Sequence, residues 1–324
     1  MGYGNYSYEA HTAIAEARVD LPRQQVFQQR STHPLMNPKG VRVRESRDSA
    51  DHPESLGIVF ALDVTGLMGD IPDLLARREL PRFMRLLGDA GVRHPQVLFL
   101  AFGDATSDQA SLQVGQFETT AELMDRWLTF SYLEGGGGGQ DHESYEVALH
   151  FLVEHVDMDC WRKRRKRGYL FLTGDERPYP LLSRHHVEAI VGDRLDEDVP
   201  TEAVVAAVQE SFEPFFLIPD PARRPRCERV WRDLLGDRVV SMSSPEDTCF
   251  VAAGLVALSE GSVDGIDGIA RMVEAHGGGR ERVSAVVRAL LPYAATIGRD
   301  RAPLPPLRAA VPTVTDGASG FTRT

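Results

Sequence analysis

Three acidic side chains each follow a short apolar stretch of the sequence, and a hydroxyl lies close to the first of them. They are Asp63, Asp104 and Asp175, with Thr65 two residues after Asp63. Carboxylate and hydroxyl groups at such positions either cap the helix that follows or face a ligand beyond the strand ends. If the fold brings these side chains together, they are candidates for a functional site.

Apolar stretches and helical spacing predict the elements that must position these residues. Continuous apolar runs indicate strands buried on both faces, at 57–62, 97–102, 169–172, 214–218 and 239–242. Helical spacing falls between them, at 74–87, 119–130, 143–155, 200–211, 228–235 and 247–258. This alternation predicts an α/β fold with a doubly wound, mostly parallel sheet, and 112–118 reads as an antiparallel edge strand. Ligand sites of such sheets lie beyond the carboxyl ends of the strands.

Changes of composition divide the chain into four parts. Residues 1–54 are a polar N-terminal extension, expected to wrap the domain or to order on a partner. The α/β domain covers 55–260, a C-terminal helical segment with helices at 265–275 and 280–293 covers 261–298, and the tail 299–324 is expected to be disordered.

Composition and charge exclude several classes of protein. Of 324 residues, 42% are hydrophobic and 26% are charged, as in ordinary globular proteins. A net charge of −11 argues against nucleic acid as a general partner. With neither a spanning apolar segment nor a signal peptide, the expectation is a cytoplasmic protein without a membrane partner. Cys160, Cys227 and Cys249 are expected to be reduced core residues.

The residues after the first strand carry a family resemblance. The sequence Asp63-Val-Thr-Gly-Leu-Met68 resembles the first motif of the von Willebrand factor A family, usually Asp-x-Ser/Thr-x-Ser, and the order of elements over 55–260 resembles that domain. In that family the motif begins a metal-ion-dependent adhesion site, whose ion accepts a carboxylate from a partner protein. The resemblance implies that Asp63, Thr65 and Asp175 bind Mg²⁺ or Mn²⁺.

The chain departs from the family pattern at three positions, one of which is Asp175, displaced by one residue from the usual Thr-Asp-Gly arrangement. Leu67 stands where the family has a second hydroxyl, which removes one ligand. After the glycines 135–139, Glu143 or Ser144 stands where the family has a threonine, and a carboxylate there would replace the lost oxygen. Asp104 is expected as an outer partner of the site.

Six consecutive basic residues form the densest charge run of the chain. They are Arg162, Lys163, Arg164, Arg165, Lys166 and Arg167. Such a run is either a solvated loop or a contact for an acidic patch of a partner protein.

These observations favour a non-enzymatic protein-binding or scaffold module that engages a partner's acidic residue through a divalent ion, within a multi-component complex. One alternative is a metal-free adaptor with Leu67 packed where an ion would sit. Another is a metal-dependent hydrolase using Asp63, Glu143 and Asp175. The sequence has no Gly-x-Ser-x-Gly, His-Glu-x-x-His or Cys-x-x-Cys motif, and the glycine run lacks the Lys-Ser/Thr pair of a nucleotide-binding loop.

Overall fold

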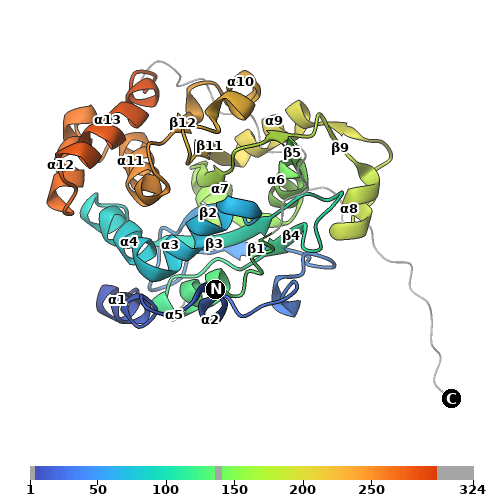
Figure 1. Cartoon of the computed structure of the whole chain (residues 1–324), viewed down its shortest axis with the longest axis horizontal. Helices are drawn as coiled ribbons and strands as arrows, with labels where there is room; N and C mark the ends of the chain where they lie inside the picture. The colour runs from blue at the N-terminus through green and yellow to red at the C-terminus, as the bar shows by residue number, and fades with distance from the viewer. Residues whose placement is uncertain (1–3, 136–140, 298–324) are drawn as a thin grey trace.

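A six-stranded sheet with helices on both faces forms the centre of the protein (Figure 1). The computed structural model describes residues 4–135 and 141–297. The strand order is β12-β11-β7-β2-β3-β4, all parallel except the edge strand β4. The strands are β2 (Leu56–Asp63), β3 (Pro95–Phe102), β4 (Leu112–Val114), β7 (Gly168–Thr173), β11 (Phe212–Ile218) and β12 (Val239–Ser241). The predicted doubly wound α/β fold with an antiparallel edge strand is confirmed.

The central strand β2 is buried along its whole length because helices cover both faces of the sheet. From β2 the chain first adds β3 and β4 on one side and then β7, β11 and β12 on the other. The strand order therefore reverses between β2 and β7, which is where open α/β sheets bind ligands. Asp63 is the last residue of β2, and Asp175 follows β7 by two residues.

The helices on one face of the sheet include α4 and α11, which pack together, and those on the other include α6 and α9 (Figure 1). The longer helices are α4 (Leu80–Asp89), α5 (Ala121–Thr129), α6 (Tyr145–Glu154), α9 (Thr201–Ser211), α10 (Arg224–Leu235), α11 (Thr248–Glu260), α12 (Gly265–Ala275) and α13 (Arg280–Ala294). The shorter ones are α3 (Asp70–Leu74), α7 (Asp159–Arg164), α8 (Arg184–Ile190) and the 3₁₀ turns η2 (Gly66–Gly69), η4 (Gly236–Arg238) and η5 (Pro245–Asp247). No helix of the described residues is long and apolar enough to cross a membrane.

Two predicted elements differ from the structure. The predicted helix 74–87 is divided into α3, a π-helical turn η3 (Leu75–Glu79) and α4. Pro81, near the start of α4, has no amide hydrogen for an α-helical bond to the preceding turn. The predicted edge strand 112–118 ends at Val114 and continues only through an isolated bridge between Val97 and Glu118.

The N-terminal residues 4–54 pack against the α/β domain. They contain α1 (Tyr8–Glu16), α2 (Arg23–Val26), η1 (Pro34–Met36) and β1 (Arg44–Ser46). β1 pairs in parallel with β6 (Val156–Met158), and α1 lies against α4 and α5. Val26, Phe27 and Met36 are buried. These residues therefore wrap the domain and add to its core.

The C-terminal helices α12 and α13 pack against each other and against the rest of the domain. The ring of Tyr293 in α13 packs against the ring of Phe215, with 4.9 Å between the two ring centres. The Tyr293 hydroxyl lies 2.8 Å from the Ser259 hydroxyl. All three cysteines are buried free thiols, as expected. The predicted disordered tail 299–324, the glycines 136–139 and the side chain of Leu67 lie outside the described residues.

Candidate functional site

Two buried carboxylates meet at one hydroxyl beyond the carboxyl end of β2. The carboxylate oxygen Oδ1 of Asp63 accepts hydrogen bonds from the Thr65 amide at 2.9 Å and the Thr65 hydroxyl at 2.7 Å. The same hydroxyl lies 3.2 Å from Oε1 of Glu143. Glu143 is placed there by β5 (His142–Glu143), which pairs with β8 (Arg177–Pro178) in the loop after β7. We call Asp63, Thr65 and Glu143 the carboxylate pair site.

The hydroxyl of Thr65 cannot satisfy both carboxylates, because it carries one hydrogen. If Thr65 donates to Asp63, its contact with Glu143 joins two electron-rich oxygens. Such a contact is favourable only with a further hydrogen on Glu143 or with a cation between the oxygens. The pair site therefore requires either a proton or a positive ion.

Burial makes this requirement stronger. The exposed fraction is 1% for Asp63 and 4% for Glu143. Oδ2 of Asp63 and Oε2 of Glu143 have no hydrogen-bond partner among the described residues. An unsatisfied buried polar atom costs about 1–3 kcal/mol, and more when it is charged.

Electrostatics follow from the same geometry. Burial raises the pKa of Asp63 and the pKa of Glu143 above their ordinary values. The negative charges of Asp175 and Glu176 raise the pKa of Asp63 further, and the charge of Asp63 raises the pKa of Glu143 further. The neighbouring charges that act on the two carboxylates are themselves acidic. A bound divalent cation would reverse this trend by favouring both ionised forms.

Asp175 lies next to the pair site but has a different partner. Its Oδ2 lies 3.4 Å from Nη1 of Arg223. Burial raises the pKa of Asp175, while Arg223 and Arg226 oppose that rise. The structure thus brings Asp175 close enough to act on the charge of Asp63, and it provides Asp175 with an arginine.

Ser144 and Asp104 belong to a neighbouring loop. The Ser144 hydroxyl accepts a hydrogen bond from the Ala105 amide at 2.8 Å, and it lies 3.5 Å from Asp104. Asp104 accepts from the amide and the hydroxyl of Thr106 at 2.9 and 2.6 Å. Of the two alternatives that the sequence leaves open, Glu143 rather than Ser144 contacts Thr65. Asp104 is 2% exposed and orders its own loop.

Tyr145 is a component that sequence reasoning missed. Its hydroxyl is buried without a hydrogen-bond partner in the described structure, and its ring contacts Phe102 and Trp231. Burial raises the pKa of Tyr145, with the charge of Asp63 as the next cause. A Cβ atom at Gly174 would lie 2.0 Å from this hydroxyl. Gly174 therefore leaves the space that Tyr145 occupies.

The donor chemistry of the pair site fits Mg²⁺ or Mn²⁺. Two carboxylates and a hydroxyl are hard oxygen donors, and two of the carboxylate oxygens are unpartnered among the described residues. The described residues contain no group of three or more His, Cys, Asp or Glu side chains with the arrangement of a metal centre. The chain itself thus supplies three donors of mixed type, two acidic and one neutral.

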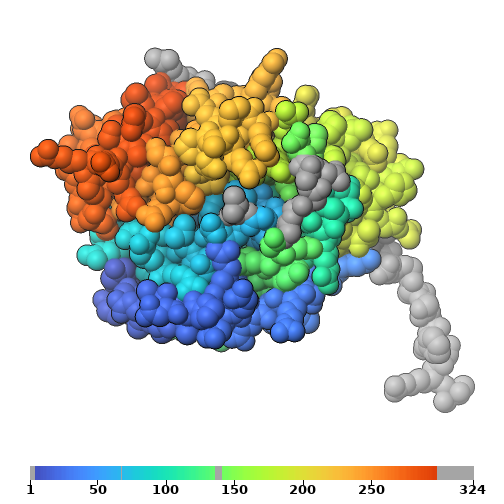
Figure 2. Space-filling view, in the orientation of Figure 1, coloured from blue at the N-terminus to red at the C-terminus, as the bar shows by residue number. Residues whose placement is uncertain are grey.

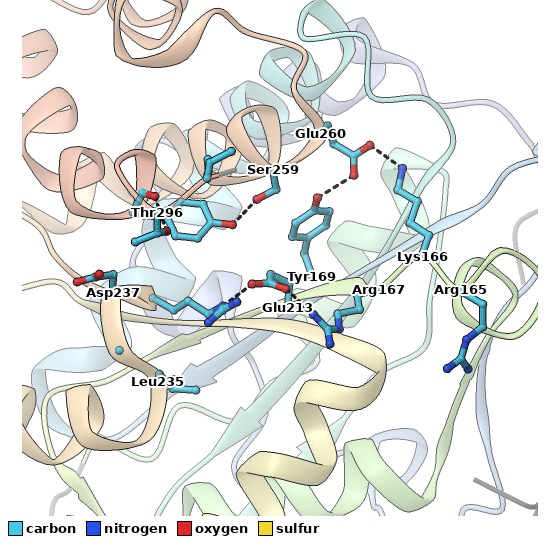
Figure 3. A pocket seen from close by; sticks show the side chains of 14 residues that line it. Arg165, Lys166, Arg167, Tyr169, Glu213, Leu235, Asp237, Ser259, Glu260 and Thr296 are labelled. Carbon is cyan, nitrogen blue, oxygen red and sulfur yellow. Dashed lines mark hydrogen bonds and ion pairs between the residues drawn. The ribbon is translucent and has the colours of Figure 1, made fainter. Parts of the chain in front are cut away.

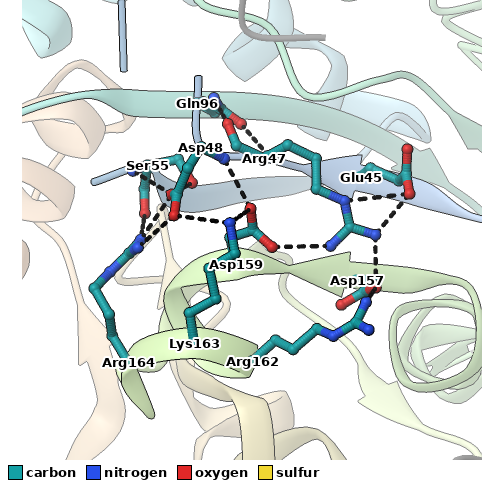
Figure 4. Close-up of polar contacts among 10 residues, drawn as sticks. All are labelled: Glu45, Arg47, Asp48, Ser55, Gln96, Asp157, Asp159, Arg162, Lys163 and Arg164. Carbon is teal, nitrogen blue, oxygen red and sulfur yellow. Dashed lines mark hydrogen bonds and ion pairs between the residues drawn. The ribbon is translucent and has the colours of Figure 1, made fainter. Parts of the chain in front are cut away.

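The basic run covers the end of α7 and reaches the residue before β7, at the opposite end of the sheet, where its side chains have partners within this chain. Their contacts are Arg162 with Asp157, Lys163 with Asp159 and Asp48, Arg164 with Asp48, Lys166 with Glu260, and Arg167 with Glu213. Figure 4 shows the partners of Arg162, Lys163 and Arg164. The guanidinium of Arg165 lies 3.6 Å from the ring centre of Trp161. Most side chains of the run thus form ion pairs with acidic residues of their own chain. A contact of the run with another protein remains a prediction.

A cavity of about 610 Å³ also lies at this opposite end of the sheet (Figure 3). Glu260 in its wall accepts a hydrogen bond from the Tyr169 hydroxyl at 2.7 Å and pairs with Lys166 at 2.6 Å. Glu213 pairs with Arg167 and Arg238. These carboxylates are neutralised by their neighbours, unlike those of the pair site.

Comparisons with known proteins identify no family. No family model and no curated protein matches the sequence. Among solved structures, the open conformation of the pilus adhesin SpaC from Lactobacillus rhamnosus GG is similar, with 12% identity and a TM-score of 0.45 over 66% of this chain and 31% of the adhesin. Proximal thread matrix protein 1 from the mussel byssus has 10% identity and a TM-score of 0.40 over 66% of this chain and 49% of that protein. This chain thus spans half or less of either protein.

Proposed function

We propose that this chain is a protein-binding module of the von Willebrand factor A type, which holds Mg²⁺ or Mn²⁺ at the carboxylate pair site and captures an acidic residue of a partner protein. The observation that carries the proposal is the contact of Asp63 and Glu143 with a single Thr65 hydroxyl, in a buried place where each carboxylate keeps one unpartnered oxygen. When bound, the divalent ion would supply a position that accepts the partner's carboxylate.

The residues of the chain have separate roles in this proposal. Asp63 is fixed by two hydrogen bonds from Thr65, so that its free oxygen keeps a defined direction. Glu143 supplies the carboxylate that replaces the hydroxyl lost at Leu67. Asp175, held by Arg223, adds negative charge nearby and strengthens the attraction for a cation.

Binding of Mn²⁺ to the purified chain, followed by electron paramagnetic resonance, tests the proposal. We expect one Mn²⁺ site, displaced by Mg²⁺, whose affinity falls at least ten-fold in Asp63→Asn and in Glu143→Gln. Glu122→Gln, which neutralises an exposed acid of α5, is the matched control and should bind Mn²⁺ like the natural chain. Equal Mn²⁺ binding by the natural chain and both pair-site variants, or no binding by the natural chain, would contradict the proposal.

A further inference from the structure

A groove of about 640 Å³ borders the loop that carries Thr65. One wall is the N-terminal segment 23–30. The other wall is formed by the loop after β2 and by residues of the loop that follows α5. The described residues that line it are Arg23, Gln24, Gln25, Phe27, Gln28, Gln29, Arg30, Val64, Gly66, Gly69, Tyr132, Leu133 and Gly135. Val64 and Gly66, the two neighbours of Thr65 in the sequence, therefore belong to the lining of the groove.

The N-terminal wall is fixed relative to that site. Val26 and Phe27 are buried in the core, with exposed fractions of 6% and 5%. Arg23 forms an ion pair with Asp70 and lies 3.7 Å from Asp73, both on α3. Because α3 follows the Thr65 loop directly, the wall and the site are held by the same element. In the space-filling view the N-terminal residues, in blue, lie against the cyan residues that follow β2 (Figure 2).

The groove differs in charge from the rest of the molecule. The chain has a net charge of −11, yet the groove is lined by four glutamines and two arginines and by no aspartate or glutamate among the described residues. Asp70 and Asp73 pair with Arg23, so the charge that the groove offers is that of Arg30. Arg30 is exposed and makes no ion pair with another described residue. Glutamine amides and the arginine fork are donors suited to carboxylates.

We propose that this groove binds an extended acidic segment of a partner protein, with carboxylates of that segment at Arg30 and at the glutamine amides. The proposal rests on the proposed function in one respect, because a further carboxylate of the same segment would reach the ion at the pair site. Buried residues anchor the wall, and Arg30 with the glutamine amides is left for recognition, although the Gln28 amide already donates one hydrogen bond to the Gln25 carbonyl at 3.0 Å. Contacts in the groove would thus give different affinities to acidic partners that bind the ion alone with the same affinity.

The test is fluorescence anisotropy with a labelled peptide of alternating Glu and Ala, whose carboxylates share one face when the peptide is extended. We expect the full-length natural chain to bind it at low salt, and Arg30→Glu to weaken binding about five- to ten-fold, since reversing a rim charge mainly slows association. Arg271→Glu, at an exposed arginine on α12, makes the same change of charge elsewhere and should alter affinity less than about two-fold.

The outcomes separate this inference from the proposed function. A loss caused by Arg30→Glu but not by Arg271→Glu supports the groove, and a gain in affinity on adding Mn²⁺ supports the ion as well. If Mn²⁺ has no effect but the Arg30→Glu loss persists, the groove stands without the ion. Equal binding by the natural chain and Arg30→Glu, or no peptide binding by the natural chain, overturns the groove proposal. Thermal unfolding of each variant verifies that it folds.

Discussion

A single threonine hydroxyl determines what the carboxylate pair site requires. It satisfies one oxygen of Asp63 and leaves Glu143 without a hydrogen from this source. Two ionised carboxylates in such a place would be strongly unfavourable, and a proton or a divalent cation resolves the conflict. Both solutions preserve the fold, and only the cation provides a place for a partner's acidic residue.

Gly174 next to this site should tolerate no side chain. In Gly174→Ala the new methyl group would overlap the buried hydroxyl of Tyr145, whose ring is held by Phe102 and Trp231. We expect the free energy of unfolding to fall by about 1–3 kcal/mol, as for overpacked cores. Urea denaturation would measure it.

Gly88→Ala is the matched control for this change, because nothing lies within 4 Å of the Cβ position in α4. Alanine there should be neutral or stabilise by about 0.5–1 kcal/mol. If Gly174→Ala proves as stable as Gly88→Ala, the close packing of Tyr145 against Gly174 is wrong.

At the scale of elements, α7 fastens the N-terminal extension to the sheet. Asp48 accepts hydrogen bonds from Arg164 at 2.7 Å and from the Ser55 hydroxyl at 2.8 Å, and Asp159 pairs with Arg47 at 3.2 Å (Figure 4). Lys163 and Arg164, which look like part of a partner surface in the sequence, thus bind Asp48 of the N-terminal extension.

Replacement of Asp48 by asparagine tests this clasp. Hydrogen bonds from Arg164 and Ser55 hold the pKa of Asp48 well below its ordinary value. A lowered folded-state pKa adds stability above the unfolded-state pKa of about 4, and this stability is lost as pH falls through the folded-state value. Asp48→Asn should therefore cost about 1–2 kcal/mol at pH 7, and the difference from the natural chain should shrink steadily below pH 4.

Asp51 is exposed in the same segment and forms no ion pair with another described residue, so Asp51→Asn is the control and should leave stability unchanged. Urea denaturation at several pH values measures both variants. A cost for Asp48→Asn that does not change with pH would show that the lost interaction is not ionic.

The strands of the sheet were predictable because a strand that is buried on both faces has an uninterrupted apolar sequence. The predicted limits of α12 and α13 also agree with the structure, since glycines punctuate both helices. The short α7 was missed, because its basic residues read as a loop. Its partner Asp48 lies 116 residues from Arg164, and no local pattern reveals a pairing at that separation.

The candidate site was predictable only in part, for a similar reason. Asp63 and Thr65 are neighbours in sequence, so their shared turn is visible in the motif. Glu143 was one of two alternatives, and only the pairing of β5 with β8 selects it. Tyr145 could not be found, because an aromatic residue in an amphipathic helix reads as core. The groove was equally hidden, since its two walls are distant in sequence.

At the scale of the whole molecule, the two ends of the sheet differ in whether their charged side chains are paired. The amino end of the sheet holds acidic and basic side chains that neutralise one another, as around Glu213 and Glu260. The carboxyl end holds the pair site, with a groove of opposite character beside it. This arrangement leaves the uncompensated carboxylates at the place where a doubly wound sheet binds ligands.

Thermal unfolding with and without millimolar Mg²⁺ or Mn²⁺ tests the central claim most directly, using the natural chain, Asp63→Asn and Glu143→Gln. A ligand that binds only the folded state at about 100 times its Kd stabilises it by about 2.7 kcal/mol, a rise of several degrees in Tm. The pKa values of Asp63 and Glu143 are raised in the folded state, so the metal-free chain loses stability as pH rises from the ordinary carboxyl range toward those raised values. The rise in Tm caused by metal should therefore grow over the same pH interval, because the metal binds the ionised carboxylates. We predict this rise in the natural chain and its absence in both variants. An unchanged Tm of the natural chain at saturating metal, or an equal rise in all three proteins, would contradict the account.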